Sequence, residues 1–464
     1  MSPPTTIENR TFDEIAVGDT ASVTRTLTVQ DIQLFALVSG DVNPAHVDPE
    51  FAATDMFHRV IAHGMWGGGL ISAVLGTELP GPGTIYLSQT LRFTRPVALG
   101  DTITATVTVA EKRVEHDLLV LECRCTNQAG EDVITGRAEV KAPRDKVSRP
   151  RVALPDVRLA GHERYHALLK RASGAAPVRA AIAHPCDPQA IRAAVQAADA
   201  GLIAPILVGP EAKIRAAAEA ASADITAFRL VPAPHSHAAA AEAVALVASG
   251  EAGLLVKGSL HTDELLSAVL AASAGLRTER RISHVYVMDV PGHPRPLLVT
   301  DAAINIEPGL EEKADIIRNA IGLAQAIGIE TPRVAILAAV ETVNPKMRST
   351  LEAAALCKMA DRGQIAGGLI DGPLALDNAI SPAAAQEKGI RSPVAGMADI
   401  LVVPNLEAGN MIAKQLTFLA GADAAGIVLG ARVPIVLTSR ADSVRTRLAS
   451  CALAVLLARA AEAG

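Results

Sequence analysis

An aspartate and a histidine near the N-terminus lie five residues apart across a tight loop. Gly40 and Pro44 bracket the loop, and Asp41 and His46 can face one another across it. A carboxylate and an imidazole held in this way can both reach one water molecule, as the hydration of an activated double bond requires. A turn capped by an Asn or Asp side chain explains the same residues without any catalysis. From the spacing alone, both interpretations stay open.

A second group of polar residues follows apolar, strand-like runs in the C-terminal part of the chain. Lys257-Gly258-Ser259 ends one run, and Ser439-Arg440 follows another. A lysine, backbone N–H groups and a hydroxyl at such a point can bind phosphate. Arginine contacts phosphate at two points, and serine can donate to a carbonyl oxygen. These groups suit a site that binds phosphate and a carbonyl oxygen, although a Ser-Arg pair there is also typical of a capped helix start.

Three further polar residues accompany this second group. His261 is a candidate partner for a thiol or a phosphate. Asp377 either borders a binding cleft or caps a helix. Asp442 either takes part in catalysis or N-caps the helix that follows it. The residue types alone do not decide between these roles.

The segment from residue 84 to residue 142 alternates between apolar and small or polar residues, which is typical of strands with one covered face. Gly100-Asp101 and the segment 127–130 supply turns between these strands. Just before them, residues 65–79 are apolar and rich in Gly and Ala, as expected of a helix buried against the sheet. We therefore predict an N-terminal α+β domain in which a curved antiparallel sheet wraps one helix, the hot-dog fold.

The pattern changes after a linker that is rich in Pro and Arg. Short apolar runs such as 203–208 now alternate with helical stretches such as 313–326. This alternation predicts a mostly parallel α/β sheet, in which ligands bind beyond the carboxyl ends of the strands. We expect an N-terminal domain at 1–145, a linker at 146–160 and a C-terminal domain at 161–464.

The composition excludes several classes of protein. Of the 464 residues, 50% are hydrophobic and 20% are charged, which allows a large core, and the net charge is −6. Because long basic runs are lacking and only 2% of residues are aromatic, nucleic acid is not an expected partner. No apolar run reaches the about 18 residues of a membrane span, and the N-terminus lacks a signal-peptide pattern, so we expect a cytoplasmic protein. The cysteines are expected to be buried thiols rather than metal ligands.

A longer stretch around the Asp-His pair resembles a known family. Two motifs carry the resemblance: Ser39-Gly40-Asp41-x-Asn43-Pro44-x-His46 and Ile61-Ala62-His63-Gly64-Met65. Over residues 12–141 the chain is similar to the MaoC-like, (R)-specific enoyl-coenzyme A hydratases. The resemblance implies that Asp41 and His46 are the catalytic acid/base pair and that Asn43 orients them. It also implies that the backbone N–H of Gly64 polarises the thioester carbonyl, a role that suits a helix N-terminus.

Two residues of this region have open roles. His63 either shapes the loop or contacts the site directly. Trp66 follows the proposed oxyanion position so closely that its indole would narrow the acyl pocket or alter its use.

The C-terminal part, from Tyr165 to Ala460, resembles the phosphate acetyl- and butyryltransferases. The matching stretches are residues 256–263, 371–378, 392–399, 403–410 and 438–443. The resemblance implies a two-lobed α/β fold similar to that of the isocitrate dehydrogenases, with Ser439 and Arg440 in the cleft. Two departures stand out. The segment 265–267 lacks an arginine that the acetyltransferase branch carries, and Asp442 lies closer to Ser439 than the aspartate of that branch does.

We therefore expect a bifunctional enzyme whose two domains both act on short acyl-coenzyme A thioesters, with inorganic phosphate as co-substrate, no tightly bound cofactor and no metal. An alternative makes the N-terminal domain a non-catalytic module for acyl-coenzyme A binding or assembly. A third hypothesis, an oxidoreductase related by fold alone, is disfavoured because a G-x-G-x-x-G dinucleotide loop is lacking. Hot-dog domains build their sites by pairing, so we expect a homodimer or a higher homo-oligomer.

Overall fold

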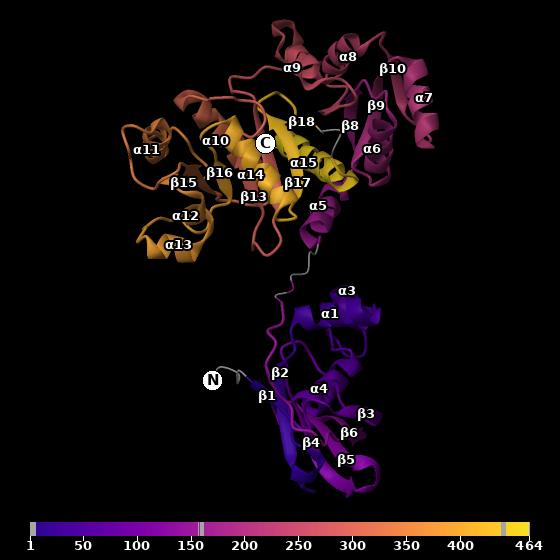
Figure 1. Cartoon of the computed structure of the whole chain (residues 1–464). Helices are drawn as coiled ribbons and strands as arrows, with labels where there is room; N and C mark the ends of the chain where they lie inside the picture. The colour runs from indigo at the N-terminus through magenta and orange to yellow at the C-terminus, as the bar shows by residue number, and fades with distance from the viewer. Residues whose placement is uncertain (1–5, 156, 158–161, 438–441, 464) are drawn as a thin grey trace. The chain divides into compact units, whose positions relative to one another are not determined.

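The computed structural model describes residues 6–155, 157, 162–437 and 442–463, without the side chains of the last two. The chain forms two compact units, Met1–Leu159 (unit 1) and Ala160–Gly464 (unit 2). Their elements are labelled in Figure 1. The boundary between the units falls inside the linker that the sequence predicts.

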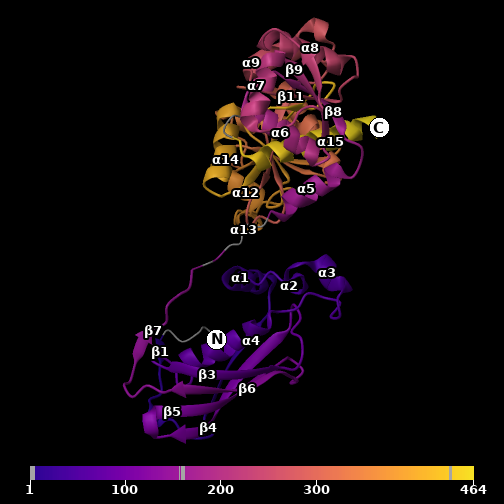
Figure 2. The same cartoon turned by 90° about the vertical axis from the view of Figure 1, so that its right-hand side faces the viewer.

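Unit 1 contains a five-stranded antiparallel sheet with the order β2-β4-β5-β6-β3. One long helix, α4 (Gly64–Thr77), packs on strands β4, β2 and β5, and Figure 2 shows it lying along the sheet. The strands are β2 (Thr20–Thr26), β3 (Ile85–Phe93), β4 (Thr102–Arg113), β5 (Leu118–Thr126) and β6 (Asp132–Lys141). A short antiparallel pair joins β1 (Thr6–Glu8) to β7 (Ser148–Pro150). The predicted hot-dog fold is confirmed.

The alternating pattern of β4 explains how the sheet covers the helix. Its residues are alternately buried and half-buried from Thr102 to Val109, so one face packs into the core while threonines occupy the other. The facing side of α4 contributes Ile71, Val74 and Leu75, which are all fully buried. The helix approaches the sheet closely at Gly67, where an added Cβ would lie 2.4 Å from a methyl carbon of Ile134.

Three short helices lie between β2 and α4. They are α1 (Val29–Ser39), α2 (Pro44–Val47) and α3 (Pro49–Thr54). Each begins at a residue whose side chain caps it: Thr28, Asn43 and Asp48. Gly40 ends α1 in the left-handed region, with φ of 74°. This segment carries the Asp-His pair.

Unit 2 is built on an eleven-stranded sheet with the order β10-β9-β8-β11-β18-β17-β12-β13-β16-β14-β15. Neighbouring strands are parallel except at the pairs β18–β17, β17–β12 and β12–β13 in the middle. The strands are β8 (Val178–Ala183), β9 (Ile203–Gly209), β10 (Arg229–Pro232), β11 (Leu254–Lys257), β12 (Ser283–Asp289), β13 (Leu297–Thr300), β14 (Arg333–Leu337), β15 (Leu369–Leu374), β16 (Ile400–Val402), β17 (Asp423–Leu429) and β18 (Ile435–Val436). A mostly parallel α/β sheet, as predicted, is confirmed.

Two lobes follow from how the helices cover this sheet. On one face, α8 and α9 share a core with β8, β11 and β18, whereas α12, α13 and α14 share a separate core with β13, β14 and β16. On the other face a single large core extends under α5, α6, α7, α10, α11 and α15. Figure 1 shows α6–α9 on one side of unit 2 and α11–α13 on the other. The two-lobed architecture is confirmed.

The helices of unit 2 are as follows: α5 (Glu163–Ser173), α6 (Pro188–Asp199), α7 (Glu211–Ala221), α8 (Ser236–Ala248), α9 (Thr262–Leu270), α10 (Leu310–Ala326), α11 (Arg348–Asp361), α12 (Leu376–Ile380), α13 (Pro382–Glu387), α14 (Leu406–Phe418) and α15 (Val444–Ala463). Among the described residues, none of the helices is both long and apolar enough to span a membrane. The expected cytoplasmic location stays a prediction.

The cysteines are unpaired thiols, three of them buried and two half-buried. Burial raises the pKa of Cys123 to about 11 and that of Cys125 and Cys451 to about 12. These thiols are therefore protonated at neutral pH and pack as small apolar side chains.

Candidate active sites

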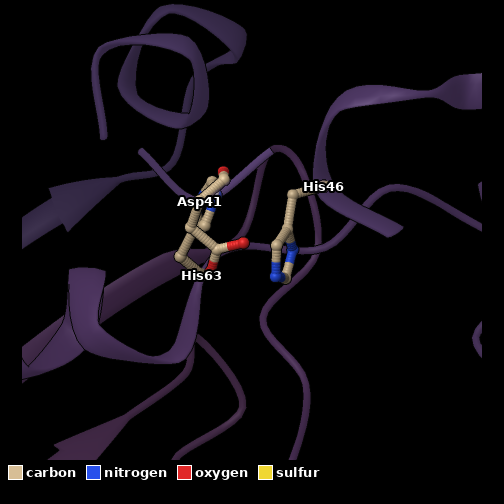
Figure 3. Close-up of side chains that lie close together, drawn as sticks. All are labelled: Asp41, His46 and His63. Carbon is tan, nitrogen blue, oxygen red and sulfur yellow. Dashed lines mark hydrogen bonds between the residues drawn. The ribbon is translucent and has the colours of Figure 1, made fainter. Parts of the chain in front are cut away.

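The site in unit 1 brings together Asp41, His46 and a third residue, His63. Each of the three side chains offers one nitrogen or oxygen atom that can bind a proton or a metal ion, and these three atoms lie within 4.8 Å of one another (Figure 3). Asp41 lies on the loop after α1, His46 lies on α2, and His63 directly precedes α4. The Asp-His pair that the sequence singles out is thus close in space, and His63, whose role the sequence left open, lies against it.

Backbone carbonyls determine which nitrogen of each ring carries the proton. Nδ1 of His46 lies 2.9 Å from the carbonyl oxygen of Ile61, and Nε2 of His63 lies 2.9 Å from that of Asp41. A carbonyl only accepts, so both of these nitrogens donate. The lone pairs are left on Nε2 of His46 and Nδ1 of His63 when the rings are neutral. His46 can therefore accept a proton from a water molecule through Nε2.

His63 is held firmly between two rings. It is 2% exposed, and its ring centroid lies 4.9 Å from that of Phe35 and 4.0 Å from that of His46. Its Nδ1 atom is buried and has no hydrogen-bond partner among the described residues. The ring therefore links the Asp41 loop to the start of α4 and supports the ring of His46.

Asn43 contacts the pair through its backbone. Its N–H donates to Oδ1 of Asp41 over 3.1 Å, while its side-chain oxygen accepts from the N–H of Ala45 over 3.1 Å. The side chain therefore caps α2, the helix that carries His46. Both contacts fix the loop that carries Asp41 and the start of the helix that carries His46.

A cavity of about 340 Å³ adjoins these residues and the first turn of α4. His46, His63 and Gly64 line it, whereas Asp41 lies on the exposed loop beside it. The first N–H groups of a helix have no partner within the helix and carry partial positive charge. A Cβ on Gly64 would lie 3.0 Å from the ring of Phe93, so the narrow space there suits glycine.

The far wall of this cavity is apolar. Trp66 is buried, and its side chain joins Val133 and Ile134 in lining the space. The indole therefore borders the space that adjoins Gly64.

In unit 2, the segment Lys257–Ser259 lies at the carboxyl end of β11, beside the end of β8. Strand β8 lies between β9 and β11 in the sheet. The chain adds β9 and β10 on one side of β8 and then returns to add β11 on the other side. Ligands of open α/β sheets bind at such a switch point. The N–H of Gly258 donates to Ala183 and that of Ser259 donates to His184, each over 2.9 Å. A Cβ at Gly258 would lie 2.4 Å from the Ala183 oxygen, so only glycine fits there.

The hydroxyl of Ser259 is occupied by the neighbouring loop. It donates to the carbonyl of His184 over 2.7 Å and accepts from the N–H of Cys186 over 3.0 Å. Ser259 thus ties the end of β11 to the loop after β8. The ammonium of Lys257 lies 3.4 Å and 3.3 Å from the carbonyls of Gly258 and Leu260.

His184 is a polar residue of this site that the sequence analysis missed. Its ring nitrogen Nδ1 lies 3.4 Å from the Ser259 hydroxyl, and its backbone has a positive φ of 54°, rare outside glycine. Burial, and then the charge of Lys213, lower the pKa of His184, so its ring is neutral at pH 7. The signal that could have revealed it is a histidine directly after a strand run.

Two of the predicted residues, Ser439 and Arg440, lie outside the described residues. Asp442, just before α15, accepts from Nε of Arg447 over 3.2 Å through its carbonyl. Arg447 and Lys257 line the same small cavity between β11 and α15. The start of α15 therefore lies close to the end of β11.

The last two predicted residues lie apart from one another. His261 is exposed at the N-cap of α9, near Lys257 in sequence. Asp377 is exposed on α12, with an oxygen 3.9 Å from the ammonium of Lys388. It follows β15, which lies seven strand positions from β11, or roughly 34 Å along the sheet at about 4.8 Å per strand. The structure therefore does not bring Asp377 to the Lys257 site.

Comparison with known proteins assigns both units. Residues 235–455 match the family model described as phosphate acetyl/butaryl transferase, and residues 16–124 match that of the MaoC like domain. A phosphate acetyltransferase of Rhizobium meliloti is 64% identical over 295 residues, which are 64% of this chain and 93% of that protein. The chain belongs to the phosphate acetyl/butyryl transferase family. It carries a MaoC-like hot-dog domain in front of the transferase domain.

Two further relatives of this transferase-family chain extend the comparison. A phosphate butyryltransferase of Clostridium acetobutylicum is 50% identical over 216 residues, or 47% of this chain and 72% of that protein. A solved branched-chain phosphotransacylase from Enterococcus faecalis is 32% identical with a TM-score of 0.55, over 61% of this chain and 99% of that one. The oxidoreductase hypothesis, based on fold alone, finds no support in this membership.

Proposed function

We propose that the chain is a bifunctional acyl-coenzyme A enzyme. Unit 2 transfers a short acyl group between coenzyme A and phosphate, and unit 1 hydrates enoyl-coenzyme A with (R) specificity. The observation that carries the transferase activity is the membership of a family whose named relatives are phosphate acetyl- and butyryltransferases. Coenzyme A, its thioesters and inorganic phosphate are then the substrates, without a tightly bound cofactor.

The proposed transfer uses Lys257 at the switch point and the candidate residues around Ser439 in the sequence. The sulfur of coenzyme A attacks the carbonyl carbon of an acyl phosphate, a tetrahedral oxyanion forms, and phosphate leaves with the electrons of the broken C–O bond. Lys257 and Arg440 bind the phosphate charge, and Ser439 donates to the oxyanion. His261 or Asp442 takes the thiol proton.

A coenzyme A release assay tests the transferase. Acetyl-, propionyl- and butyryl-coenzyme A are each mixed with phosphate and with either wild type or Arg440→Ala. Loss of one transition-state contact is expected to lower the rate at least about 100-fold. Arg215→Ala is the matched control and should keep the wild-type rate, because this exposed arginine of α7 pairs, among the described residues, with Glu211 of the same helix. An Arg440→Ala protein with full activity would refute the assignment.

The proposed hydration uses the lone pair on Nε2 of His46. This nitrogen takes a proton from a water molecule as the water oxygen bonds to the β-carbon of the enoyl thioester. The N–H of Gly64 stabilises the enolate oxygen that forms. The acid/base pair of Asp41 and His46 then returns a proton to the α-carbon, so that H and OH are added across the double bond.

Hydration of crotonyl-coenzyme A by the full chain tests this second activity. Asp41→Asn and His46→Gln should each lower the rate about 100- to 10,000-fold while leaving the transferase rate unchanged, which serves as an internal folding control. Wild-type hydration that survives both substitutions would contradict the role of the pair.

The buried Trp66 on the cavity wall favours a second candidate, a non-catalytic module for acyl-coenzyme A. Saturable binding of crotonyl-coenzyme A by a wild-type chain that does not hydrate it would support the module. Turnover would exclude it.

A homodimer through unit 1 is the assembly we propose. Strand β3 is an edge of the five-stranded sheet, and it exposes Ile85, Leu87 and Phe93. Exposed apolar edges of this kind pair with another chain unless they are protected. In light scattering, the wild type should be a dimer or a larger species, and the variant Leu87→Lys should be a smaller species.

A further inference from the structure

We propose that Asp41, His46 and His63 also bind one divalent transition-metal ion, and that this ion blocks hydration while it is bound. Possible ligand atoms of the three side chains lie within 4.8 Å of one another (Figure 3). Metal binding is argued from the structure and does not depend on the proposed hydratase function. The inhibition rests in addition on the proposed hydratase function.

Both histidines have the proton arrangement that a metal ligand needs. The Nδ1–H of His46 donates to Ile61, and the Nε2–H of His63 donates to the carbonyl of Asp41. Histidines that bind metals commonly donate their other N–H to a backbone carbonyl, which fixes the ring. The lone pairs on Nε2 of His46 and Nδ1 of His63 are then free for a cation without the loss of a ring proton.

The burial of His63 is the second observation that points to a ligand. The residue is 2% exposed, and its Nδ1 atom has no hydrogen-bond partner among the described residues. A buried polar atom without a partner is costly. A cation beside Nδ1 would satisfy this lone pair.

Asp41 supplies the negative charge. Its Oδ1 accepts the N–H of Asn43, and Oδ2 accepts no hydrogen bond from the described residues. The carboxylate lies on the exposed loop after α1, so its side chain has room to turn towards an ion. Two imidazoles and one carboxylate favour Zn²⁺ or Co²⁺ over Mg²⁺ or Ca²⁺, which prefer oxygen ligands.

The expected ligand geometry requires a modest closure. Around a tetrahedral Zn²⁺ with bonds of about 2.0–2.2 Å, the ligand atoms lie roughly 3.3 Å apart. The ligand atoms, which now lie within 4.8 Å of one another, would have to approach to this spacing, and a turn of the exposed Asp41 side chain would contribute to it. The ion then uses the same lone pair of His46 that would otherwise accept the proton of the water, so metal and hydration exclude one another.

Metal binding is measured on the full chain, with Zn²⁺ by calorimetry and Co²⁺ by its visible absorption. Wild type should bind one equivalent of the metal ion. The variants His63→Gln and Asp41→Asn should bind none, or should bind it at least about tenfold more weakly. Glutamine at position 63 can still donate to the Asp41 carbonyl, which preserves the loop. His116→Asn, which removes an imidazole from the exposed turn before β5, is the matched control and should bind as wild type does. Identical stoichiometry and affinity in all four proteins would overturn the proposal.

Inhibition is measured as the Zn²⁺ concentration that halves crotonyl-coenzyme A hydration, relative to the zinc-free rate of the same protein. We expect wild type and His116→Asn to be inhibited and a chelator to restore them, with His63→Gln at least tenfold less sensitive. Zinc-insensitive hydration in a wild type that binds the ion would refute the blocking role. A wild type that binds the ion but never hydrates would support the metal site and refute the hydratase function, so the two failures are distinguishable.

Discussion

The ammonium of Lys313 lies 2.5 Å from a carboxylate oxygen of Glu352, and the two side chains, from α10 and α11, are only 5% and 11% exposed. Arg348 contacts the other oxygen of Glu352 over 2.6 Å. The carboxylate therefore has two cationic partners in a site that is largely shielded from solvent. Removing one partner from such a site lowers the stability of the fold.

The substitution Lys313→Met is expected to destabilise unit 2 by about 3 kcal/mol. It leaves Glu352 buried with Arg348 as its remaining cationic partner. Urea unfolding followed by loss of transferase activity measures this change. In the double variant Lys313→Met with Glu352→Leu, both charges are gone, so most of the stability should return. A double variant as weak as the single one would contradict the explanation.

Acid should weaken the same contact. Burial by itself would raise the pKa of Glu352, but hydrogen bonds and charge from Lys313 and Arg348 outweigh it and lower this pKa below its ordinary value. Because the pKa of Glu352 is lower in the folded chain than in the unfolded chain, its ionised carboxylate stabilises the fold. This stabilisation is fully present above the unfolded pKa of about 4.3 and is lost as the pH falls through the folded pKa. The stability difference between wild type and the variant Glu352→Gln should therefore shrink as the pH falls below about 4. A difference that is constant from pH 7 to pH 3 would argue against this titration.

Gly258→Ala should strongly lower the rate of acyl transfer and leave the rate of hydration unchanged. The new Cβ would collide with backbone oxygens of Ala183 and His184, at 2.4 Å and 2.6 Å, so the end of β11 must move. We expect the transferase rate to fall at least about 100-fold, because a displacement of about 1 Å is enough for such a loss. Gly322→Ala, on the exposed side of α10 with open space around it, is the matched control and should stabilise unit 2 by about 0.5–1 kcal/mol. Equal activity of both variants would disprove a tight approach at Gly258.

Asn43→Ala should lower hydration roughly tenfold, since the side chain that caps α2 beneath His46 is lost and the cap is worth about 1 kcal/mol. Asn43→Asp keeps an oxygen at the cap and should retain most of the rate. The kcat for crotonyl-coenzyme A hydration checks both. If aspartate and alanine prove equally harmful, the amide of Asn43 acts on the substrate and not on the helix.

Local sequence was enough to predict the elements and the Asp-His pair. Asp41 and His46 lie five residues apart, on a short loop and on the helix α2 that follows it, so their closeness depends on a few backbone angles near Gly40 and Pro44. The alternation along β4 likewise follows from which residues are apolar, because neighbouring side chains of a strand point to opposite faces. Each of these two features depends on residues that lie close together in the sequence.

Tertiary structure decided what lies beside those elements. His63 reaches His46 because the segment before α4 runs past α2, where the N–H of Ile61 donates to Ala45. The hydroxyl of Ser259 is likewise bound by a loop from another strand. Asp377, which the motifs grouped with Lys257, lies seven strand positions away in the sheet. Periodicity reports which face of an element is buried, whereas the order of strands depends on how distant segments pack. For this reason the sequence alone was enough to predict the two domains and to propose a chemistry for each, whereas only the tertiary structure decided which side chains lie together.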